Sequence, residues 1–179
     1  AGRIQGSLTL VLGHSMFFSE SGNVDDCNAA ELVRLRDSGT HLCHLPWVKA
    51  RQGTAMRSFA KYRRHGIPVC LGTDTYPFDM FNEMRMAAAL CRIAEGSPQA
   101  VSAAEIFHAA TVSGAQALQR PDLGRLAAGC QADIVLVDVI KPHAVPLRDG
   151  IQHLVLSACA ADVDTVFVAG RLVVHRREL

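Results

Sequence analysis

Asp74 is the residue whose position most strongly suggests chemistry. It ends segment 66–74, in which an apolar run stops at a small residue, a hydroxyl and a carboxylate. A carboxylate just past the end of a buried strand is costly unless it faces a cation or several hydrogen-bond donors. In parallel α/β folds, ligands and catalytic groups lie at the carboxyl ends of the strands. Asp74 is therefore a candidate metal ligand or general base, the alternative being a carboxylate satisfied by backbone N–H groups of the next helix.

Two histidines follow similar apolar runs at the same interval. His14 comes after residues 8–13 and His44 after residues 40–43, so that positions 14, 44 and 74 are separated by 30 residues each time. An imidazole at such a place is a candidate ligand or proton shuttle, and the alternative is a core histidine with satisfied nitrogens. The regular spacing favours His14 as the functional partner of Asp74.

The second of these strands carries two histidines. His41 and His44 are separated by three residues, which places their side chains on opposite faces of a strand. His44 is nearer the carboxyl end and is the one expected to reach the site. Trp47, in the loop expected after this strand, either lines a pocket or caps the rim.

Each interval of 30 residues also contains helix signals. Asn28 and Glu31 form a capping box, and Gly39 can end that helix. A second helix is expected over residues 54–65. Alternating strands and helices at this period predict parallel βαβ units with right-handed crossovers. A complete eight-stranded barrel has about 31 residues per unit, but a doubly wound sheet can approach the same period, so spacing alone leaves both open.

The remaining chain divides into helices and a small β layer. Asp79 is the expected N-cap of a third helix, and Ser102 and Glu105 form the capping box of a fourth. Beyond residue 120, segment 133–138 has the pattern of a strand, and segments 165–168 and 172–174 flank a hairpin turn. We therefore expect an α/β part over residues 1–120 and a β layer over residues 121–179.

Composition narrows the possible partners. The 179 residues carry a net charge of +1, with 49% hydrophobic and 20% charged residues, which indicates a globular protein without a basic field for nucleic acid. The six cysteines include no C-x-x-C pair, which favours a reducing, cytoplasmic location over a disulfide framework. Apolar runs are too short for a secretory signal or a membrane span. Composition thus indicates neither a nucleic-acid partner nor a membrane partner.

Several segments together resemble one family. Residues 71–74, followed by Asp79-Met80-Phe81-Asn82-Glu83-Met84-Arg85, resemble the eighth-strand signature of the metal-dependent amidohydrolase superfamily, in the branch of the cytosine deaminases, adenosylhomocysteine deaminases and triazine hydrolases. Gly13-His14 and His44-Leu45-Pro46 are similar to the sixth- and seventh-strand motifs. Segments 123–135 and 162–171 resemble the return of the chain into the family's β-sandwich.

The resemblance implies a fold: part of a TIM (β/α)8-type barrel, strands six to eight with their helices, over residues 1–120, and part of the β-sandwich over residues 121–179. It implies hydrolysis of a non-peptide C–N bond by metal-activated water, such as deamination of a cyclic amidine or nucleobase-like substrate, with Zn²⁺ or Fe²⁺. Asp74 and His14 would be metal ligands and catalytic residues, and His44 and Trp47 would bind the small-molecule substrate. Segments 47–49 and 75–78 depart from the family pattern, at places that shape the substrate pocket.

The family's His-x-His motif does not occur in this sequence, and its one His-x-x-Glu pattern, at His175 and Glu178, lies in the C-terminal β layer and not at the place of the family's motif. The resemblance therefore implies the C-terminal portion of an enzyme, and we expect the chain alone to be inactive. Three parallel strands leave open edges, so pairing with another copy or with the N-terminal half is expected. The alternative function is a non-catalytic amidohydrolase-like scaffold or assembly protein.

Overall fold

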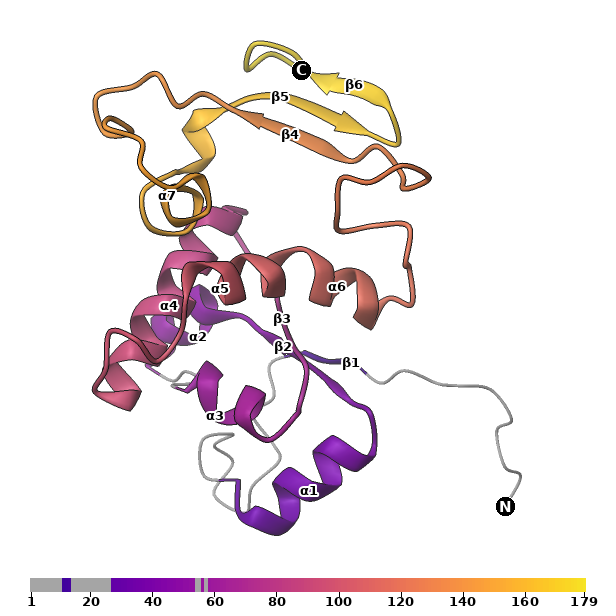
Figure 1. The fold of residues 1–179 in the computed structure, drawn as a ribbon, viewed down its shortest axis with the longest axis vertical. Helices are drawn as coiled ribbons and strands as arrows, with labels where there is room; N and C mark the ends of the chain where they lie inside the picture. The colour runs from indigo at the N-terminus through magenta and orange to yellow at the C-terminus, as the bar shows by residue number, and fades with distance from the viewer. Residues whose placement is uncertain (1–10, 14–26, 54–55, 57) are drawn as a thin grey trace.

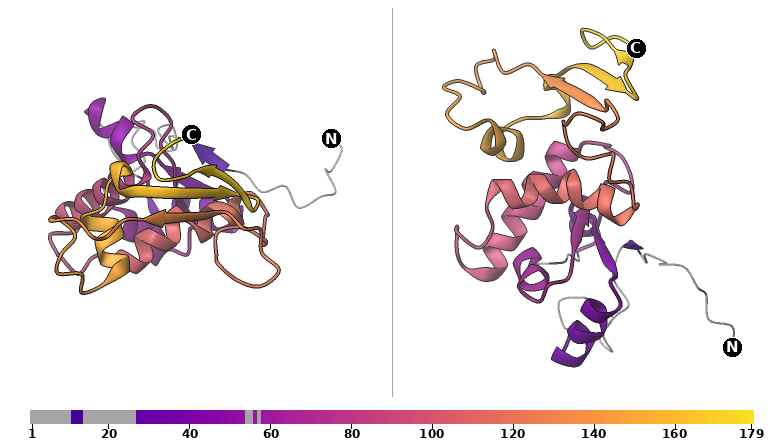
Figure 2. Two further views of the ribbon diagram at one scale, coloured as in Figure 1. Left: turned by 90° about the horizontal axis from the view of Figure 1, so that it is seen from above. Right: turned by 45° about the vertical axis from the view of Figure 1, so that its right-hand side comes forward.

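The computed structural model describes residues 11–13, 27–53, 56 and 58–179 (Figure 1). A parallel sheet with helices forms one end of the molecule, and an antiparallel sheet forms the other (Figures 1 and 2). None of the helices in this described part is long and apolar enough to cross a membrane.

Among the described residues, the parallel sheet has three strands, in the order in which they occur in the chain. They are β1 (Val11–Gly13), β2 (His41–His44) and β3 (Val69–Leu71). Leu42 of β2 pairs with Val69 of β3, and both side chains are buried in the hydrophobic core. The parallel arrangement confirms the prediction made from the 30-residue period.

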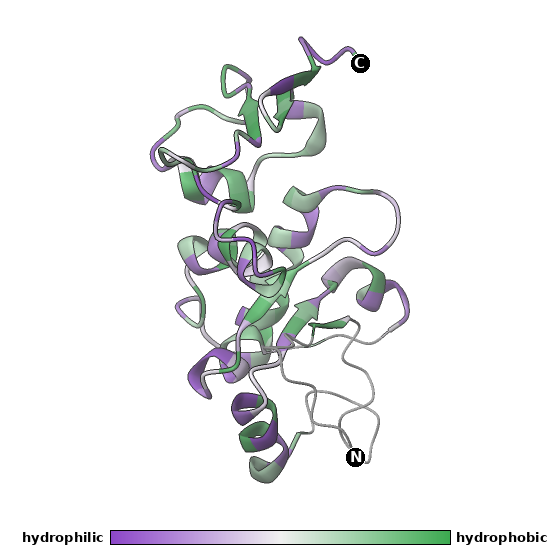
Figure 3. Cartoon of the chain, turned by 90° about the vertical axis from the view of Figure 1, so that its right-hand side faces the viewer, coloured by the Kyte–Doolittle hydropathy of each residue, from purple (hydrophilic) through white to green (hydrophobic). Residues whose placement is uncertain are grey.

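Helices that follow these strands cover one face of the sheet. The α-helices of this part are α1 (Ala29–Asp37), α2 (Pro46–Arg51), α3 (Phe59–Arg64), α4 (Met80–Glu95), α5 (Ala103–Ala110) and α6 (Val112–Ala117). The capping boxes predicted for α1 and α5 are present, and α1 turns a hydrophilic side outward (Figure 3). The helix predicted over residues 54–65 begins only at Phe59, because the Ser58 hydroxyl accepts the Lys61 N–H and so caps the helix there. Residues 54, 55 and 57 of that prediction lie outside the described part of the chain.

Helix α4 forms the centre of the core. The Asp79 side chain accepts the N–H groups of Phe81 and Asn82, which confirms the predicted N-cap. Gly96 ends the helix in the left-handed conformation, at φ 62°. The buried face of α4 packs into one cluster with strand and helix residues. Its buried apolar members are Met84, Ala87, Ala88 and Cys91.

The strands of the antiparallel sheet overlap the segments for which the sequence predicted strands. The sheet consists of β4 (Ile134–Val137), β5 (Val163–Val168) and β6 (Arg171–Val174). Ala169 and Gly170 join β5 to β6 with φ of 51° and 76°, as a type I′ hairpin turn requires. Helix α7 (Gly150–Leu156) was not predicted. The Arg85 guanidinium of α4 ties it to the core by donating to the carbonyl oxygens of Leu156 and Ala158 at 3.0 and 2.5 Å.

Candidate functional site

Asp74 lies in a tight turn directly after β3. The Gly72 N–H donates to the His44 carbonyl at 3.0 Å, which extends the pairing of β2 and β3 to the end of the sheet. The Thr75 N–H then donates to the Thr73 carbonyl at 2.7 Å, and Asp74 between them has a φ of 61°. A residue with a Cβ atom rarely adopts this left-handed conformation, and such residues concentrate at functional sites. The carboxylate is exposed at the carboxyl edge of the sheet.

Asp74 acts on the face of the sheet opposite to that of Leu42 and Val69. Cys43 and Cys70 pair in register on β2 and β3, on the opposite face from Leu42 and Val69. The Cys70 thiol and burial raise the pKa of Cys43, and the negative charge of Asp74 adds to the effect. Asp74 is thus close enough to this face for its charge to act there.

His44 is buried on the helix-covered face. It pairs with Leu71, a residue of the hydrophobic core, and its side chain is 3% exposed. Burial lowers its pKa to about 3, so the imidazole is neutral, and its Nε2 has no hydrogen-bond partner among the described residues. The His44 side chain lies on the same face of β2 as Leu42 and on the opposite face from Cys43. Its role in binding substrate remains a prediction.

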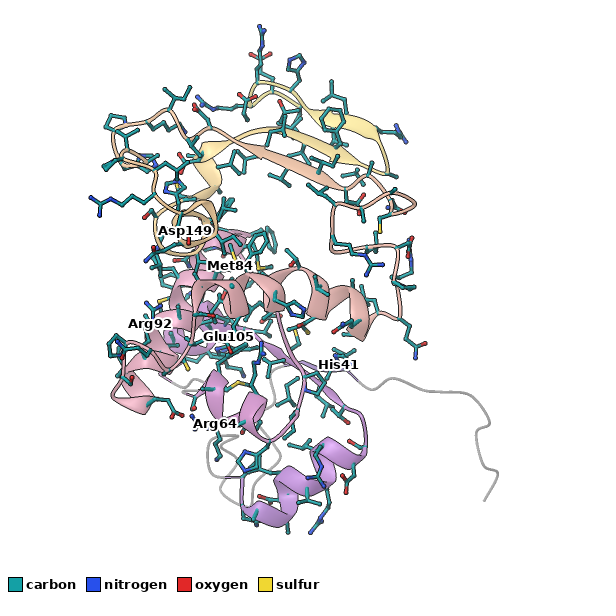
Figure 4. The ribbon with its side chains drawn as sticks, viewed as in Figure 1. His41, Arg64, Met84, Arg92, Glu105 and Asp149 are labelled. Carbon is teal, nitrogen blue, oxygen red and sulfur yellow. The ribbon has the colours of Figure 1, made fainter. Side chains whose placement is uncertain are left out.

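His41 lies on the other face of β2, as the odd spacing predicted. Strand β2 alternates between half-buried and buried residues, and His41 is half-buried. It pairs with Val11 and lies beside β1, away from Met84, Arg92 and Glu105 (Figure 4). Its place at the start of the strand is far from the carboxyl edge.

Trp47 lies in a helix and not in a loop. Helix α2 starts at Pro46, and proline favours the first helical position because its missing N–H and fixed φ cost nothing there. The Trp47 backbone N–H donates to Glu83 Oε2 at 2.9 Å. Its indole Nε1 is buried without a hydrogen-bond partner in the described part of the chain.

Glu83 is a buried polar residue to which the sequence assigned no role. It is 0% exposed, and burial raises its pKa to about 7, an effect that the Trp47 N–H opposes. Its second oxygen, Oε1, has no partner within the described ranges. Its spacing from Met80, Met84 and Ala87 places it on the apolar face of α4, which is the signal that could have revealed it.

Lys49 was also missed. Its side chain is 4% exposed, and its Nζ has no hydrogen-bond partner among the residues described. Burial lowers the pKa of Lys49, and Asp74 opposes that shift through its charge. A buried ammonium beside the candidate catalytic carboxylate is unusual, and the neighbouring sequence offers no pattern that predicts it.

The predicted metal site can be tested only in part, because His14 lies outside the described residues. Within residues 11–13, 27–53, 56 and 58–179, no three His, Cys, Asp or Glu side chains lie together in a way that could hold a metal ion. Asp74 offers an exposed carboxylate oxygen, a ligand that zinc accepts. The described residues thus fit one ligand of a metal site and do not complete it.

A mixed α/β fold with a carboxylate at the carboxyl edge of a parallel sheet defines a class of proteins that bind ligands at that edge. The family model for the amidohydrolase family matches residues 2–173. This chain belongs to the amidohydrolase family.

Several curated relatives of this chain carry deaminase names. The 5-methylthioadenosine/S-adenosylhomocysteine deaminase of Pelotomaculum thermopropionicum is 37% identical over 142 residues, which cover 77% of this chain and 33% of that protein. The 5'-deoxyadenosine deaminase of Methanosarcina mazei is 35% identical over 145 residues, or 79% of this chain and 33% of that protein. The chain spans about a third of the length of these relatives.

Solved structures agree with this family. An adenosine deaminase from Xanthomonas campestris with bound zinc superposes with a TM-score of 0.84 and 27% identity, over 95% of this chain and 38% of that one. Atrazine chlorohydrolase from Arthrobacter aurescens, complexed with zinc and atraton, superposes with a TM-score of 0.79 and 26% identity, over 94% and 36%.

Proposed function

We propose that this chain is the C-terminal part of a metal-dependent hydrolase that deaminates a nucleoside-like or cyclic amidine substrate. Residues 1–120 would supply strands six to eight of a barrel, and residues 121–179 would supply part of the β-sandwich. The observation that carries the proposal is the left-handed turn that presents Asp74 at the carboxyl end of β3. The deaminase names of the relatives support the reaction class.

Asp74 would hold the metal through its carboxylate, together with ligands from the rest of the enzyme, and His14 would join the ligands if a second metal were present. Zinc or Fe²⁺, when bound, supplies the Lewis acidity that makes water a nucleophile near neutral pH. Asp74 would accept a proton from the attacking water and return it to the leaving nitrogen. His14 would donate a hydrogen bond to the attacking oxygen or to the substrate, and His44 and Trp47 would support the substrate pocket.

The proposal is tested with the longer polypeptide that contains this chain. We expect it to release ammonia from 5'-deoxyadenosine or 5-methylthioadenosine, to lose that activity on chelation and to recover it with zinc or Fe²⁺. A metal-replete polypeptide that neither binds nor deaminates adenosine-type or triazine-type compounds would favour the scaffold function instead. The 179-residue chain alone should be inactive, because it supplies too few ligands to hold a metal against water.

A further inference from the structure

No contact of the Lys49 side chain within the described residues explains why this residue is buried. A cation removed from water is costly unless an anion or several acceptors compensate it. Lys49 is 4% exposed, and the part of the chain that the structure describes offers no acceptor to its Nζ. Glu83 is also buried with an unpartnered oxygen, yet the two side chains do not pair. The ammonium is thus available for an anion that is absent from the described residues.

The helix that carries Lys49 turns this residue toward the end of β3. The Lys49 N–H donates to the Leu45 carbonyl at 3.2 Å, so the two residues lie one turn apart on the same side of α2. Leu45 packs against Gly72, since a Cβ atom added at Gly72 would lie 2.9 Å from Leu45 Cδ2. Gly72 precedes Asp74 by two residues. Lys49 and Asp74 therefore share the carboxyl end of β3, in agreement with the effect of Asp74 on Lys49.

Two polar contacts hold α2 in this position. The first is the bond from the Trp47 N–H to Glu83 Oε2 at 2.9 Å, which fastens α2 to α4. The second is the bond from Arg51 Nη1 to the Tyr76 carbonyl at 3.3 Å, which fastens α2 to the segment after Asp74. The position of Lys49 is therefore set by contacts of its neighbours, and no ion pair of its own is needed to set it.

Asp74 alone does not balance this charge. In the proposed function, on which this inference rests, Asp74 shares its negative charge with a metal cation. An ammonium near that cation is then repelled by it and requires another anion. We propose that Lys49 is a specificity residue that binds an acidic group, a carboxylate or a phosphate, of the substrate held at Asp74.

The test uses the longer, metal-replete polypeptide and three adenine compounds that differ in the acidic group they carry. 5'-Methylthioadenosine is the neutral probe, S-adenosylhomocysteine carries a carboxylate beside its α-ammonium group, and adenosine 5'-monophosphate carries a phosphate. Dissociation constants are measured by stopped-flow fluorescence, in the binding phase that precedes turnover, for the wild type, Lys49→Met, Lys49→Arg and Arg34→Met. Arg34 is an exposed cation on α1 and serves as the matched control.

We expect at least one acidic probe to bind about tenfold or more tightly than the neutral probe, since a desolvated charge pair contributes at least that much. Lys49→Met should remove this preference and leave binding of the neutral probe within about twofold, Lys49→Arg should keep part of it, and Arg34→Met should change nothing. Which acidic probe responds identifies the carboxylate or the phosphate as the group recognised. Lys49→Met should also unfold at the same or a higher temperature than the wild type, because it removes an unpaired buried charge.

The inference is overturned if neither acidic probe is preferred, or if Lys49→Met weakens the neutral and acidic probes equally. It is also overturned if Lys49→Met lowers the unfolding temperature by several degrees, which would show that an acid elsewhere in the polypeptide pairs with Lys49. These failures leave deamination of the neutral probe intact, so they are distinct from a failure of the proposed function. Preferred binding of an acidic probe without turnover of any probe would instead contradict the proposed function alone.

Discussion

Two buried carboxyl groups, one beside each sheet, differ in the number of hydrogen-bond donors that surround them. Glu83, beside the parallel sheet, is 0% exposed and receives one hydrogen bond from the described residues, donated by the Trp47 N–H. Asp162, beside the antiparallel sheet, is 1% exposed and receives bonds from Lys141 Nζ at 2.6 Å, His143 Nε2 at 3.0 Å and the Cys159 N–H at 2.9 Å.

The pKa values follow the donors and not the burial. Burial raises the pKa of Glu83 to about 7, because one donor does not compensate it. Burial acts in the same direction on Asp162, but the bonds from Lys141 and His143 outweigh it and hold the pKa well below its usual range. Asp162, which has several hydrogen-bond donors, therefore stabilises the fold around it. Glu83, which has one donor and an unpartnered oxygen among the described residues, lies in the region that carries the candidate site.

The largest stability effect is expected for Asp162→Asn. The substitution removes the buried anion to which the partly exposed side chains of Lys141 and His143 donate, and should cost about 3 kcal/mol of unfolding free energy. Urea denaturation of the polypeptide measures this cost, and hydrogen exchange should locate the loosening at residues 138–149. Asp122→Asn is the control, because its ion pair with Arg120 is on the surface and should contribute much less to stability. Equal costs for the two substitutions would break the comparison.

Glu83→Gln should stabilise the fold at high pH, whereas Asp162→Asn destabilises it. The folded-state pKa of Glu83 lies above its unfolded value of about 4.3, so its contribution to stability is fully present below that value and is lost as the pH rises to about 7. At pH 8 the amide should therefore stabilise the protein by about 1–2 kcal/mol, with little effect at pH 4. Unfolding free energies of both proteins at these two pH values measure the difference. A difference that does not change with pH would contradict the assignment.

The smallest effect is expected for His143→Ala. His143 is 47% exposed on its side chain, and Lys141 and the Cys159 N–H continue to satisfy Asp162 without it. The cost should be about 0.5–1 kcal/mol. The contribution of the Asp162 network is present above pH 4 and is lost as the pH falls further through the lowered folded-state pKa. Thermal unfolding at pH 7 and pH 3 compares the variant with the wild type.

The features that were best predicted from the sequence are those that depend on residues close together in the chain. The capping boxes at Asn28 and Ser102 and the N-cap at Asp79 each act within three residues, and all three are present. The parallel sheet was predicted because its strands recur at a constant interval. Helix α2 was missed, although Pro46 at its first position is a local signal.

What the sequence could not predict depends on contacts between distant segments. The surroundings of Glu83 depend on Trp47, which is 36 residues away in the chain. Those of Lys49 depend on how α2 packs against the end of β3. The burial of either side chain follows from tertiary packing, which hydrophobic periodicity does not encode. Asp74 was found because the end of a buried strand is visible in the sequence itself.

The central claim is that Asp74 takes part in the chemistry and does not merely end a strand. The direct measurement is the rate of ammonia release by the metal-replete polypeptide with Asp74→Asn, beside Asp37→Asn as an exposed control on α1. We predict that Asp74→Asn lowers kcat about a thousandfold while the unfolding temperature stays within a few degrees, and that Asp37→Asn retains full activity. A rate for Asp74→Asn within about threefold of the wild type, against the loss expected of a general base, would contradict the claim.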